Sequence, residues 1–259
     1  MPLKPPVSKY RRYADYYDLF YKKKNYQKEV TFLEKIFNKY SKSPIISILD
    51  LGCGLGGHSL ILAKRGYEIV GVDLSSKLIR LGQKKVKKHK LNANFLKGDI
   101  RNIDLGRKFD AAIAMFNVVG YQVRNEDFKR MVKTANRHVK KEGLFVFDCW
   151  FGPAVLFQKP DNWLKIFKEG RERVIKFTQP TLDKKNKVVN LKYMVFRVFG
   201  KKILDEFEEQ HILRFFFPKE IKQFLKRERF KILKIAPLFD LNKTPTVNDW
   251  NVIVISRKI

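Results

Sequence analysis

The sequence contains few of the cysteines that cross-link secreted proteins and lacks the long apolar runs that anchor membrane proteins. Its 259 residues include two cysteines and four histidines, which excludes a disulfide framework. Neither cysteine stands at metal-ligand spacing from a histidine or an aspartate. No apolar run reaches the roughly twenty residues that a membrane-spanning helix needs, and the polar start Met1–Lys4 is unlike a signal peptide. We therefore expect a cytoplasmic protein with no metal site and no membrane contact.

Acidic residues are also scarce, because 26 Asp and Glu stand against 55 Lys and Arg, for a formal net charge of +29. A basic surface attracts phosphate polymers. The excess nevertheless extends through residues 1–43, 44–150 and 151–259 alike, without an RNA-binding motif. The densest run, Lys84–Lys90, falls at a predicted helix end, where cations interact favourably with the helix dipole. We interpret the charge as a solvated basic surface and keep nucleic-acid binding as the less favoured alternative.

Glycine is concentrated in one short segment. An apolar stretch over 45–51, predicted to be a strand, runs into the turn Gly52–Gly57, and a predicted helix over 58–65 follows. Glycines allow a sharp turn and let the backbone approach a ligand that a Cβ would displace. The spacing fits both the G-x-G-x-x-G of dinucleotide enzymes and the G-x-G-x-G of enzymes that use S-adenosylmethionine (SAM). The turn alone therefore leaves both ligand classes open.

Carboxylates around this turn favour SAM. Asp73 ends the next predicted strand at the separation expected for a group that binds a ribose diol, which suits both ligands. Asp99 ends a third predicted strand, where a SAM enzyme uses an acid to accept from the adenine amino group while the N–H of Ile100 donates to the ring. Asp50, just before the turn, would repel a pyrophosphate, whereas SAM carries a sulfonium and an ammonium. The sequence therefore predicts a SAM site.

Five segments, in the expected order and at the expected intervals, resemble the class I SAM-dependent methyltransferases. They are Leu49–Gly54, Val72–Ser75, Gly98–Arg101, Phe109–Phe116 and Gly143–Asp148. The resemblance implies an α/β fold: a Rossmann-like seven-stranded methyltransferase sheet with an inserted antiparallel β lid and N-terminal cap helices. It also implies S-adenosylmethionine as cofactor and S-adenosylhomocysteine as product.

A narrower resemblance concerns the methyl acceptor. Tyr17–Tyr21, Met115–Tyr121 and Trp150 are similar to the branch that methylates small molecules, which includes the amino-sugar N-methyltransferases. The N/D-P-P-Y/F motif of the enzymes that methylate adenine, cytosine or glutamine nitrogen is missing, and Met115–Val118 stand in its place. The cysteine pairs of RNA cytosine-C5 enzymes are missing too.

Four segments make up the predicted organisation. Residues 1–43 form N-terminal cap helices, 44–156 the SAM-binding core, 157–217 the antiparallel β insertion, and 218–259 the completion of the core sheet. Alternating strands and helices in the core indicate a parallel sheet with helices on both faces. Core elements are predicted at 45–51, 58–65, 67–73, 75–90, 93–98, 109–115, 126–140 and 143–149, with Asn125 capping the helix at 126–140. Insertion strands are predicted at 173–178, 188–198 and 207–216, followed by a helix at 219–228 and strands at 230–235 and 250–256.

The glycine turn, the strand ends and nearby aromatic residues supply the predicted cofactor site. Its members are Tyr21, Asp50, Gly52, Cys53, Gly54, His58, Asp73, Leu74, Asp99, Ile100 and Phe116. Tyr21 would close the methionine pocket from a cap helix, with packing onto the core as the competing interpretation. His58 is equally well explained as a plain helix-start residue.

Ligands of parallel sheets bind beyond the carboxyl ends of the strands, so acceptor residues should follow the strands. Tyr121 and His211 are the predicted catalytic residues, which would orient or deprotonate the acceptor, with packing as the alternative for both. The predicted substrate-binding residues are Tyr17, Asn117, Asp148, Trp150 and Arg214.

The sequence thus predicts a methyltransferase that methylates a nitrogen or oxygen of a small molecule by in-line displacement. The acceptor lone pair must lie about 3–3.5 Å from the methyl carbon and in line with the leaving sulfur. Two alternatives stay open: a tRNA or rRNA methyltransferase, motivated by the charge, and a SAM-binding protein without transferase activity. The small-molecule acceptor is the expected partner, and a homodimer is left open.

Overall fold

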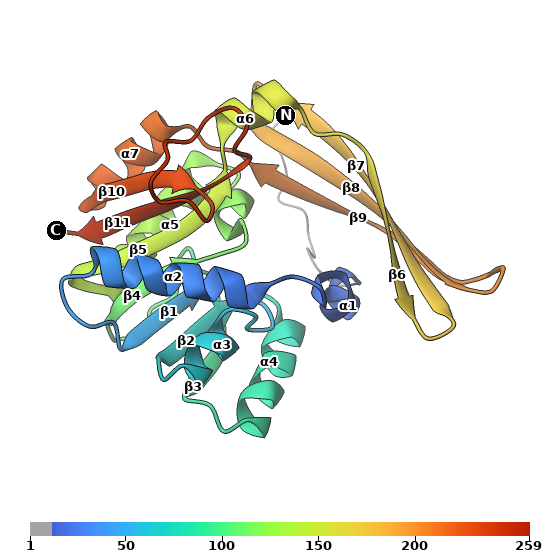
Figure 1. Cartoon of the computed structure of the whole chain (residues 1–259), viewed down its shortest axis with the longest axis horizontal. Coiled ribbons are helices and arrows are strands. Elements are labelled where there is room, and N and C mark those ends of the chain that lie inside the picture. Colours follow the sequence, from blue (N-terminus) through green and yellow to red (C-terminus); the bar gives the residue numbers. More distant parts are fainter. Residues whose placement is uncertain (1–11) are drawn as a thin grey trace. The chain divides into compact units, whose positions relative to one another are not determined.

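The computed structural model describes residues 12–259, which form two compact units, each with its own sheet (Figure 1). The core unit comprises residues 25–158 and 214–259. The insertion unit comprises residues 159–213 together with the described residues 12–24. The predicted cap segment is therefore divided, because its last helix belongs to the core unit and its first turns belong to the insertion unit.

The core unit contains a seven-stranded sheet in the order β10-β11-β5-β4-β1-β2-β3. Its strands are β1 (Ser47–Leu51), β2 (Glu68–Asp73), β3 (Ala93–Lys97), β4 (Phe109–Ala114), β5 (Val139–Trp150), β10 (Phe230–Pro237) and β11 (Asn251–Lys258). Strands β1 to β5 pair in parallel, and β11 pairs antiparallel with both β5 and β10. The predicted Rossmann-like α/β class is confirmed.

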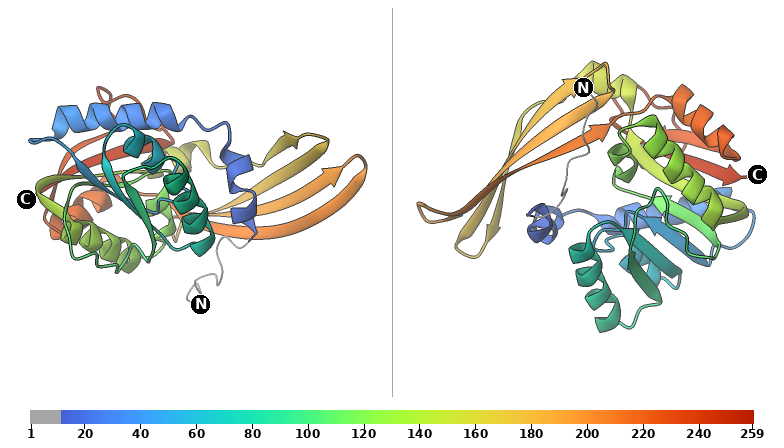
Figure 2. Two further views of the ribbon diagram at one scale, coloured as in Figure 1. Left: turned by 90° about the horizontal axis from the view of Figure 1, so that it is seen from below. Right: turned by 180° about the vertical axis from the view of Figure 1, so that it is seen from behind.

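Helices cover both faces of this sheet (Figure 2). They are α2 (Tyr26–Tyr40), α3 (Ser59–Lys64), α4 (Ser76–Lys88), α5 (Asn125–His138), α6 (Gly152–Gln158) and α7 (Pro218–Arg227), with the short 3-10 turn η2 (Val118–Tyr121). Ile48 of β1 packs in one buried cluster with Val30 of α2 and Leu62 of α3. The next residue, Leu49, packs in a second cluster with Phe128 of α5. Because side chains alternate along a strand, a strand buried on both faces needs a continuous apolar run.

Helix α5 buries its predicted apolar stripe but starts differently from the prediction. Val132 and Ala135 are fully buried. Arg124 occupies the N-cap position without a side-chain capping bond, and Asn125 is the first helical residue. The prediction that Asn125 caps the helix is therefore wrong. Its carboxamide oxygen instead accepts a hydrogen bond from Arg214 Nη2 at 2.7 Å, so a tertiary contact replaces the local one.

The insertion unit contains four antiparallel strands rather than the three that were predicted. They are β6 (Trp163–Glu169), β7 (Glu172–Asp183), β8 (Val188–Phe199) and β9 (Lys202–Arg214), in that order across the sheet. Strand β6 lacks the usual mark of a half-buried strand, because its apolar residues Leu164 and Ile166 are 56% and 53% exposed at the edge of the sheet. The inserted antiparallel β sheet itself is confirmed.

The N-terminal turns pack on one face of the insertion sheet. They are η1 (Tyr13–Asp15) and α1 (Tyr17–Tyr21). Tyr13 is buried and stacks on Tyr193 of β8 with 5.2 Å between ring centres. Arg12 forms an ion pair with Asp205 of β9. A helix of five residues is unstable alone, and α1 is held by tertiary contacts such as that of Phe20 with Phe167 of β6, 5.0 Å between ring centres.

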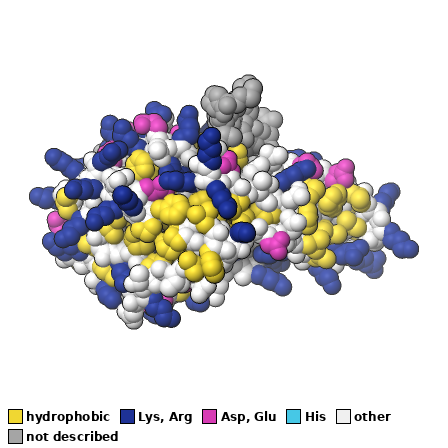
Figure 3. Space-filling model, turned by 90° about the horizontal axis from the view of Figure 1, so that it is seen from above, with side chains coloured by type: hydrophobic (Ala, Val, Ile, Leu, Met, Phe, Trp, Pro, Cys, Tyr) yellow, Lys and Arg dark blue, Asp and Glu magenta, His cyan; other side chains and the backbone are white. Residues whose placement is uncertain are grey.

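On the face shown in Figure 3, Lys and Arg side chains are spread among apolar and uncharged ones and form no single tract. This distribution agrees with a basic excess that runs through the whole sequence. Among residues 12–259, no helix is both long enough and apolar enough to cross a membrane.

Candidate active site

The glycine turn adopts backbone conformations that other residues avoid. The φ angle is +84° at Gly52, +55° at Gly54 and +83° at Gly56, all in the left-handed region. A Cβ on Gly52 would lie 2.5 Å from Cγ1 of Val118 in η2. The N–H of Gly52 donates to the Val72 carbonyl at 2.7 Å, which pins the turn to β2. The turn therefore lies tightly between β2 and η2, with no room for a side chain at its first glycine.

Asp73, at the carboxyl end of β2, presents a carboxylate to this turn. Its oxygens accept from the backbone N–H groups of Gly54 at 2.9 Å and Ser75 at 2.8 Å. A carboxylate has about four acceptor positions, so roughly two are left for other donors. Burial raises the pKa of Asp73, and the two N–H donors oppose that shift. The group therefore has the capacity to accept both hydroxyls of a diol.

Asp99, directly after β3, accepts several hydrogen bonds from Arg101. Its two oxygens accept from the backbone N–H, Nε and Nη2 of Arg101 at 2.6–3.0 Å. Burial alone would raise the pKa of Asp99, but the hydrogen bonds and charge of Arg101 outweigh it and hold that pKa below its usual value. Nε divides one hydrogen between the two oxygens, so three hydrogens serve about four acceptor positions and leave about one position for another donor. Within residues 12–259, the backbone N–H of Ile100 donates to no acceptor. An open acceptor beside an unpaired donor suits the edge of an adenine ring.

Asp50 and His58 lie behind the turn and are engaged with protein partners. Asp50 is buried and accepts from the Ser59 hydroxyl at 2.6 Å, and burial raises its pKa. His58 is 6% exposed, and its Nε2 lies 2.5 Å from Oε2 of Glu29 on α2. The ring of His58 also packs edge-on against Tyr26. This pair joins α2 to the start of α3 and gives the Nε2 atom of His58 a partner within the protein.

The chain leaves β4 through two successive left-handed residues. The φ angle is +69° at Phe116 and +55° at Asn117, conformations that are costly for residues with a Cβ. Asp148, at the end of β5, stabilises this turn, because both its oxygens lie 2.9–3.1 Å from the N–H of Asn117. Asn117 is 7% exposed, and neither polar atom of its carboxamide has a hydrogen-bond partner within the described residues. Strained backbone and an unsatisfied buried amide are typical of a ligand-binding position.

Three other predicted residues of the core unit lie beside this turn or behind it. Tyr121 ends η2 and is half-buried. Trp150 packs edge-on against Trp250, with 5.7 Å between ring centres. Arg214 is 4% exposed and donates to Asn125 and to Glu220, the latter at 3.2 Å. The Arg214 side chain therefore contacts α5 and α7 within the core unit.

The sequence analysis missed a buried lysine in the insertion unit. Lys176 of β7 is 7% exposed, and its Nζ donates to Tyr13 Oη at 2.7 Å. The same ammonium lies 4.0–4.8 Å from the ring centres of Tyr13, Phe20 and Tyr193. Burial lowers the pKa of Lys176 to about 7, aided by the charge of Lys165 and opposed by that of Glu209. The available signal was the strand alternation, since every second residue from 174 to 178 faces the same side.

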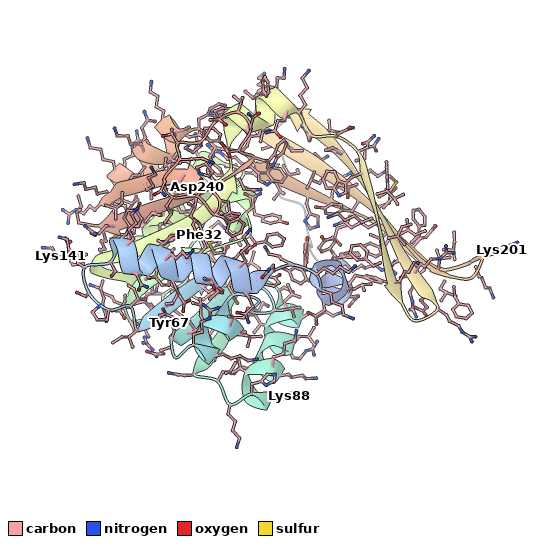
Figure 4. The ribbon with its side chains drawn as sticks, in the orientation of Figure 1. Phe32, Tyr67, Lys88, Lys141, Lys201 and Asp240 are labelled. Carbon is pink, nitrogen blue, oxygen red and sulfur yellow. The ribbon has the colours of Figure 1, made fainter. Side chains whose placement is uncertain are left out.

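His211 belongs to the same buried cluster. It is 1% exposed, its Nε2 lies 3.0 Å from Oε1 of Glu209, and its ring packs against Tyr13 and Tyr193. Tyr21 Oη lies 2.6 Å from Tyr13 Oη. These residues are on the part of the sheet covered by η1 and α1, whereas Lys201 marks the β8–β9 turn at the far end of the hairpin (Figure 4).

The predicted site residues are divided between the two units. At the carboxyl edge of the core sheet lie Asp50, Gly52, Cys53, Gly54, His58, Asp73, Leu74, Asp99, Ile100, Phe116, Asn117, Tyr121, Asp148 and Trp150. Tyr17, Tyr21 and His211 lie in the insertion unit. The core unit by itself therefore carries the candidate cofactor site.

Neither thiol belongs to the chemistry of this edge. Cys53 and Cys149 are free and buried, and burial raises the pKa of both well above the usual value, so neither is a reactive thiolate at neutral pH. The described part of the chain contains no group of three His, Cys, Asp or Glu residues that could hold a metal ion.

Comparisons with known proteins identify a methyltransferase domain in this chain. A family model described as a methyltransferase domain matches residues 48–143, the segment that runs from the glycine turn to the start of β5. The chain is 30% identical over 165 residues to a dTDP-3-amino-3,4,6-trideoxy-alpha-D-glucopyranose N,N-dimethyltransferase of Streptomyces venezuelae, covering 61% of this chain and 66% of that protein. It is 28% identical over 193 residues to the putative methyltransferase YqeM of Bacillus subtilis, covering 74% and 76%. The chain therefore spans about two thirds to three quarters of these two relatives.

Solved structures show the same fold over nearly the whole chain. A SAM-dependent methyltransferase from Clostridium acetobutylicum superposes with a TM-score of 0.81 at 22% identity, covering 96% of this chain and 98% of that one. The sugar N-methyltransferase KedS8 from Streptoalloteichus gives a TM-score of 0.80 at 18% identity, covering 100% and 98%. With the glycine turn, the two strand-end carboxylates and the matching domain model, the cofactor is SAM. The chain belongs to the class I SAM-dependent methyltransferases.

Proposed function

We propose that this protein transfers methyl groups from SAM to the amine nitrogen of an amino sugar carried on a small molecule. The observation that carries the proposal is the carboxyl edge of the core sheet. There Asp73 and Asp99 keep acceptor positions for one ligand. The unsatisfied carboxamide of Asn117 follows β4, which lies in the sheet between β5, the strand of Asp148, and the strands that lead to the two aspartates. Relatives named as N,N-dimethyltransferases of dTDP-linked amino sugars support nitrogen as the methylated atom.

Each cofactor contact in the proposal uses a group that the fold leaves available. Asp73 would accept the ribose hydroxyls, and Asp99 would accept from the adenine amino group while the Ile100 N–H donates to the ring. The glycine turn would lie against the methionine part, where its small residues leave room for a ligand. When bound, SAM supplies a methyl group activated by a sulfonium leaving group.

The protein's own task is then positioning. A neutral amine attacks without a base, whereas a hydroxyl needs one within hydrogen-bond reach. Asn117 and Tyr121 would orient the acceptor from the core unit, and Asp148 would hold the turn that presents them. His211, whose Nε2 lies 3.0 Å from Oε1 of Glu209, remains the proposed base of the insertion unit. Trp150, packed edge-on against Trp250, would supply an aromatic wall from the core unit.

A matched pair of substrates tests the proposal. The purified protein is incubated with methyl-labelled SAM and a dTDP-linked 3-amino or 4-amino sugar, and in parallel with the same sugar carrying a hydroxyl in place of the amine. We expect the amino sugar to gain the mass of one or two methyl groups and the hydroxy sugar to gain none. Methylation of the hydroxy sugar alone would contradict the assignment of nitrogen.

Total RNA is the third arm of this experiment. The net charge of +29 motivates it, although basic side chains form no single tract on the face in Figure 3. Phosphate-dominated binding should fall steeply with added salt. Label that enters RNA but none of the small molecules would refute the small-molecule assignment.

We further propose that the protein acts in the cytoplasm and that it forms a homodimer. The apolar residues Leu164 and Ile166, exposed on the edge strand β6, support an assembly of copies. Light scattering after size-exclusion chromatography measures the mass in solution, and a monomer at working concentration would contradict the dimer.

A further inference from the structure

Four charged side chains form a chain of ion pairs from the end of β3 to the start of α5. Arg101 grips Asp99 and also donates from Nη1 to Oδ1 of Asp127 at 3.2 Å. Arg124 donates to both oxygens of Asp127 at 2.9–3.0 Å. Asp127 is 6% exposed and lies in the first turn of α5, where the helix dipole favours a carboxylate. Arg101 is therefore fixed by Asp127 on one side while it holds Asp99 on the other.

We propose that Arg101 is a positioning residue for SAM, which holds the Asp99 carboxylate turned so that its open acceptor position faces the adenine amino group. The inference rests on the proposed SAM site and extends it to a residue that touches no reacting atom. The geometry supports it because three N–H groups of Arg101, with Nε shared between both oxygens, fill all but about one of the acceptor positions of Asp99.

Removing Arg101 would change Asp99 in two ways. The carboxylate would lose the two side-chain donors, Nε and Nη2, and would keep only the backbone N–H of residue 101. The Asp99 side chain is 22% exposed, so water replaces these donors poorly. Burial would then raise the pKa of Asp99, since the opposing charge of Arg101 is gone. A protonated or rotated acid accepts the adenine amino group poorly. Arg101 should therefore set both the affinity for SAM and the low-pH limit of binding.

The competing explanation of these ion pairs is that Arg101 only joins the segment after β3 to α5 and has no effect on the orientation of Asp99. Arg124 provides the matched control, because it donates to the same Asp127 but makes no bond to Asp99. Arg124→Ala disturbs the α5 end of the chain of ion pairs and leaves the grip on Asp99 in place. A merely structural role for Arg101 predicts similar effects of the two substitutions on SAM binding.

SAM affinity of the full chain is measured by calorimetry from acidic to neutral pH, with thermal unfolding of each variant recorded alongside. Arg101→Ala should weaken SAM about tenfold at neutral pH, the effect of losing one hydrogen bond to a charged group, and should move the acid loss of binding to higher pH. Arg124→Ala should leave the affinity within about twofold and the acid limit unchanged. If the two variants behave alike, the positioning role is wrong.

A double-mutant cycle tests whether Arg101 acts through Asp99. In an Asp99→Asn background, Arg101→Ala should weaken SAM no further, whereas an equal loss in both backgrounds would overturn the proposal. The hypoxanthine analogue of S-adenosylhomocysteine, which has a carbonyl in place of the amino group, adds a second readout. The wild-type protein should prefer the adenine compound, and Arg101→Ala should lose most of that preference. Failure of the wild-type protein to bind SAM would instead count against the proposed function.

Discussion

The two units treat buried polar groups in opposite ways. In the core unit, the carboxylates of Asp73 and Asp99 meet some of their hydrogen-bonding capacity inside the protein and keep the rest for a ligand. In the insertion unit, Lys176 is enclosed by aromatic rings and bonded to Tyr13, and His211 is paired with Glu209. The core thus preforms a binding edge, whereas the insertion unit pairs its buried polar groups with partners of its own.

The largest effect should come from the buried lysine. The folded-state pKa of Lys176, about 7, lies below the usual 10.5, so the unfolded chain binds more protons between these values and stability rises with pH through that window. Lys176→Met should remove this slope and stabilise the insertion unit at pH 7 by about 1–4 kcal/mol. Denaturant unfolding at pH 7 and pH 9 measures both, with the exposed Lys168→Met as control. If the unfolding free energy of Lys176→Met still rises with pH as it does in the wild-type protein, Lys176 is not the source of this pH dependence.

Two glycines separate backbone strain from steric fit in the core unit. Gly52 and Gly66 both have positive φ, at +84° and +96°, but a Cβ at Gly52 meets Val118 at 2.5 Å and one at Gly66 meets nothing within 4 Å. Gly66→Ala should cost about 1 kcal/mol from strain alone, and Gly52→Ala about 3 kcal/mol from strain and overpacking together. Unfolding in urea compares them. Equal costs would show that the glycine turn is not tightly enclosed by η2.

Two aspartates sharpen the difference between binding and stability. Asp73→Asn should weaken SAM tenfold to a hundredfold while leaving the unfolding free energy nearly unchanged, because burial already raises the pKa of Asp73 and so opposes its charge. Calorimetry and urea unfolding of the same variant measure both. Unchanged SAM affinity in Asp73→Asn would contradict the assignment of Asp73 as a residue that binds the cofactor.

Asp110, at the start of β4, is the matched carboxylate with the opposite behaviour. Burial pushes its pKa up, but bonds from Lys140, Ser47 and Ile46 outweigh this and lower it to about 2. Its stabilising effect is therefore present above the unfolded pKa near 4 and is lost as pH falls through about 2. Asp110→Asn should cost about 1–2 kcal/mol at pH 7 and leave SAM affinity unchanged. A loss of SAM affinity here would remove the contrast with Asp73.

Local patterns were enough to predict the core. The glycine turn, Asp73 and Asp99 follow strands whose apolar runs are continuous, and their spacing along the chain fixes which strand ends they occupy. Strand β6 escaped prediction because an exposed edge strand lacks the alternation that burial imposes. The capping role assigned to Asn125 failed because Arg214, distant in sequence, binds the same carboxamide.

The sequence by itself determined the fold class and the methyl donor, since each depends on short segments and their spacing. Only the tertiary structure decided which polar groups remain available. Arg101 donates to most acceptor positions of the Asp99 carboxylate, and Glu29 pairs with Nε2 of His58. The carboxamide of Asn117 has no hydrogen-bond partner within the described residues. These outcomes depend on which side chains from distant segments meet in a confined space, where every donor and acceptor must find a partner.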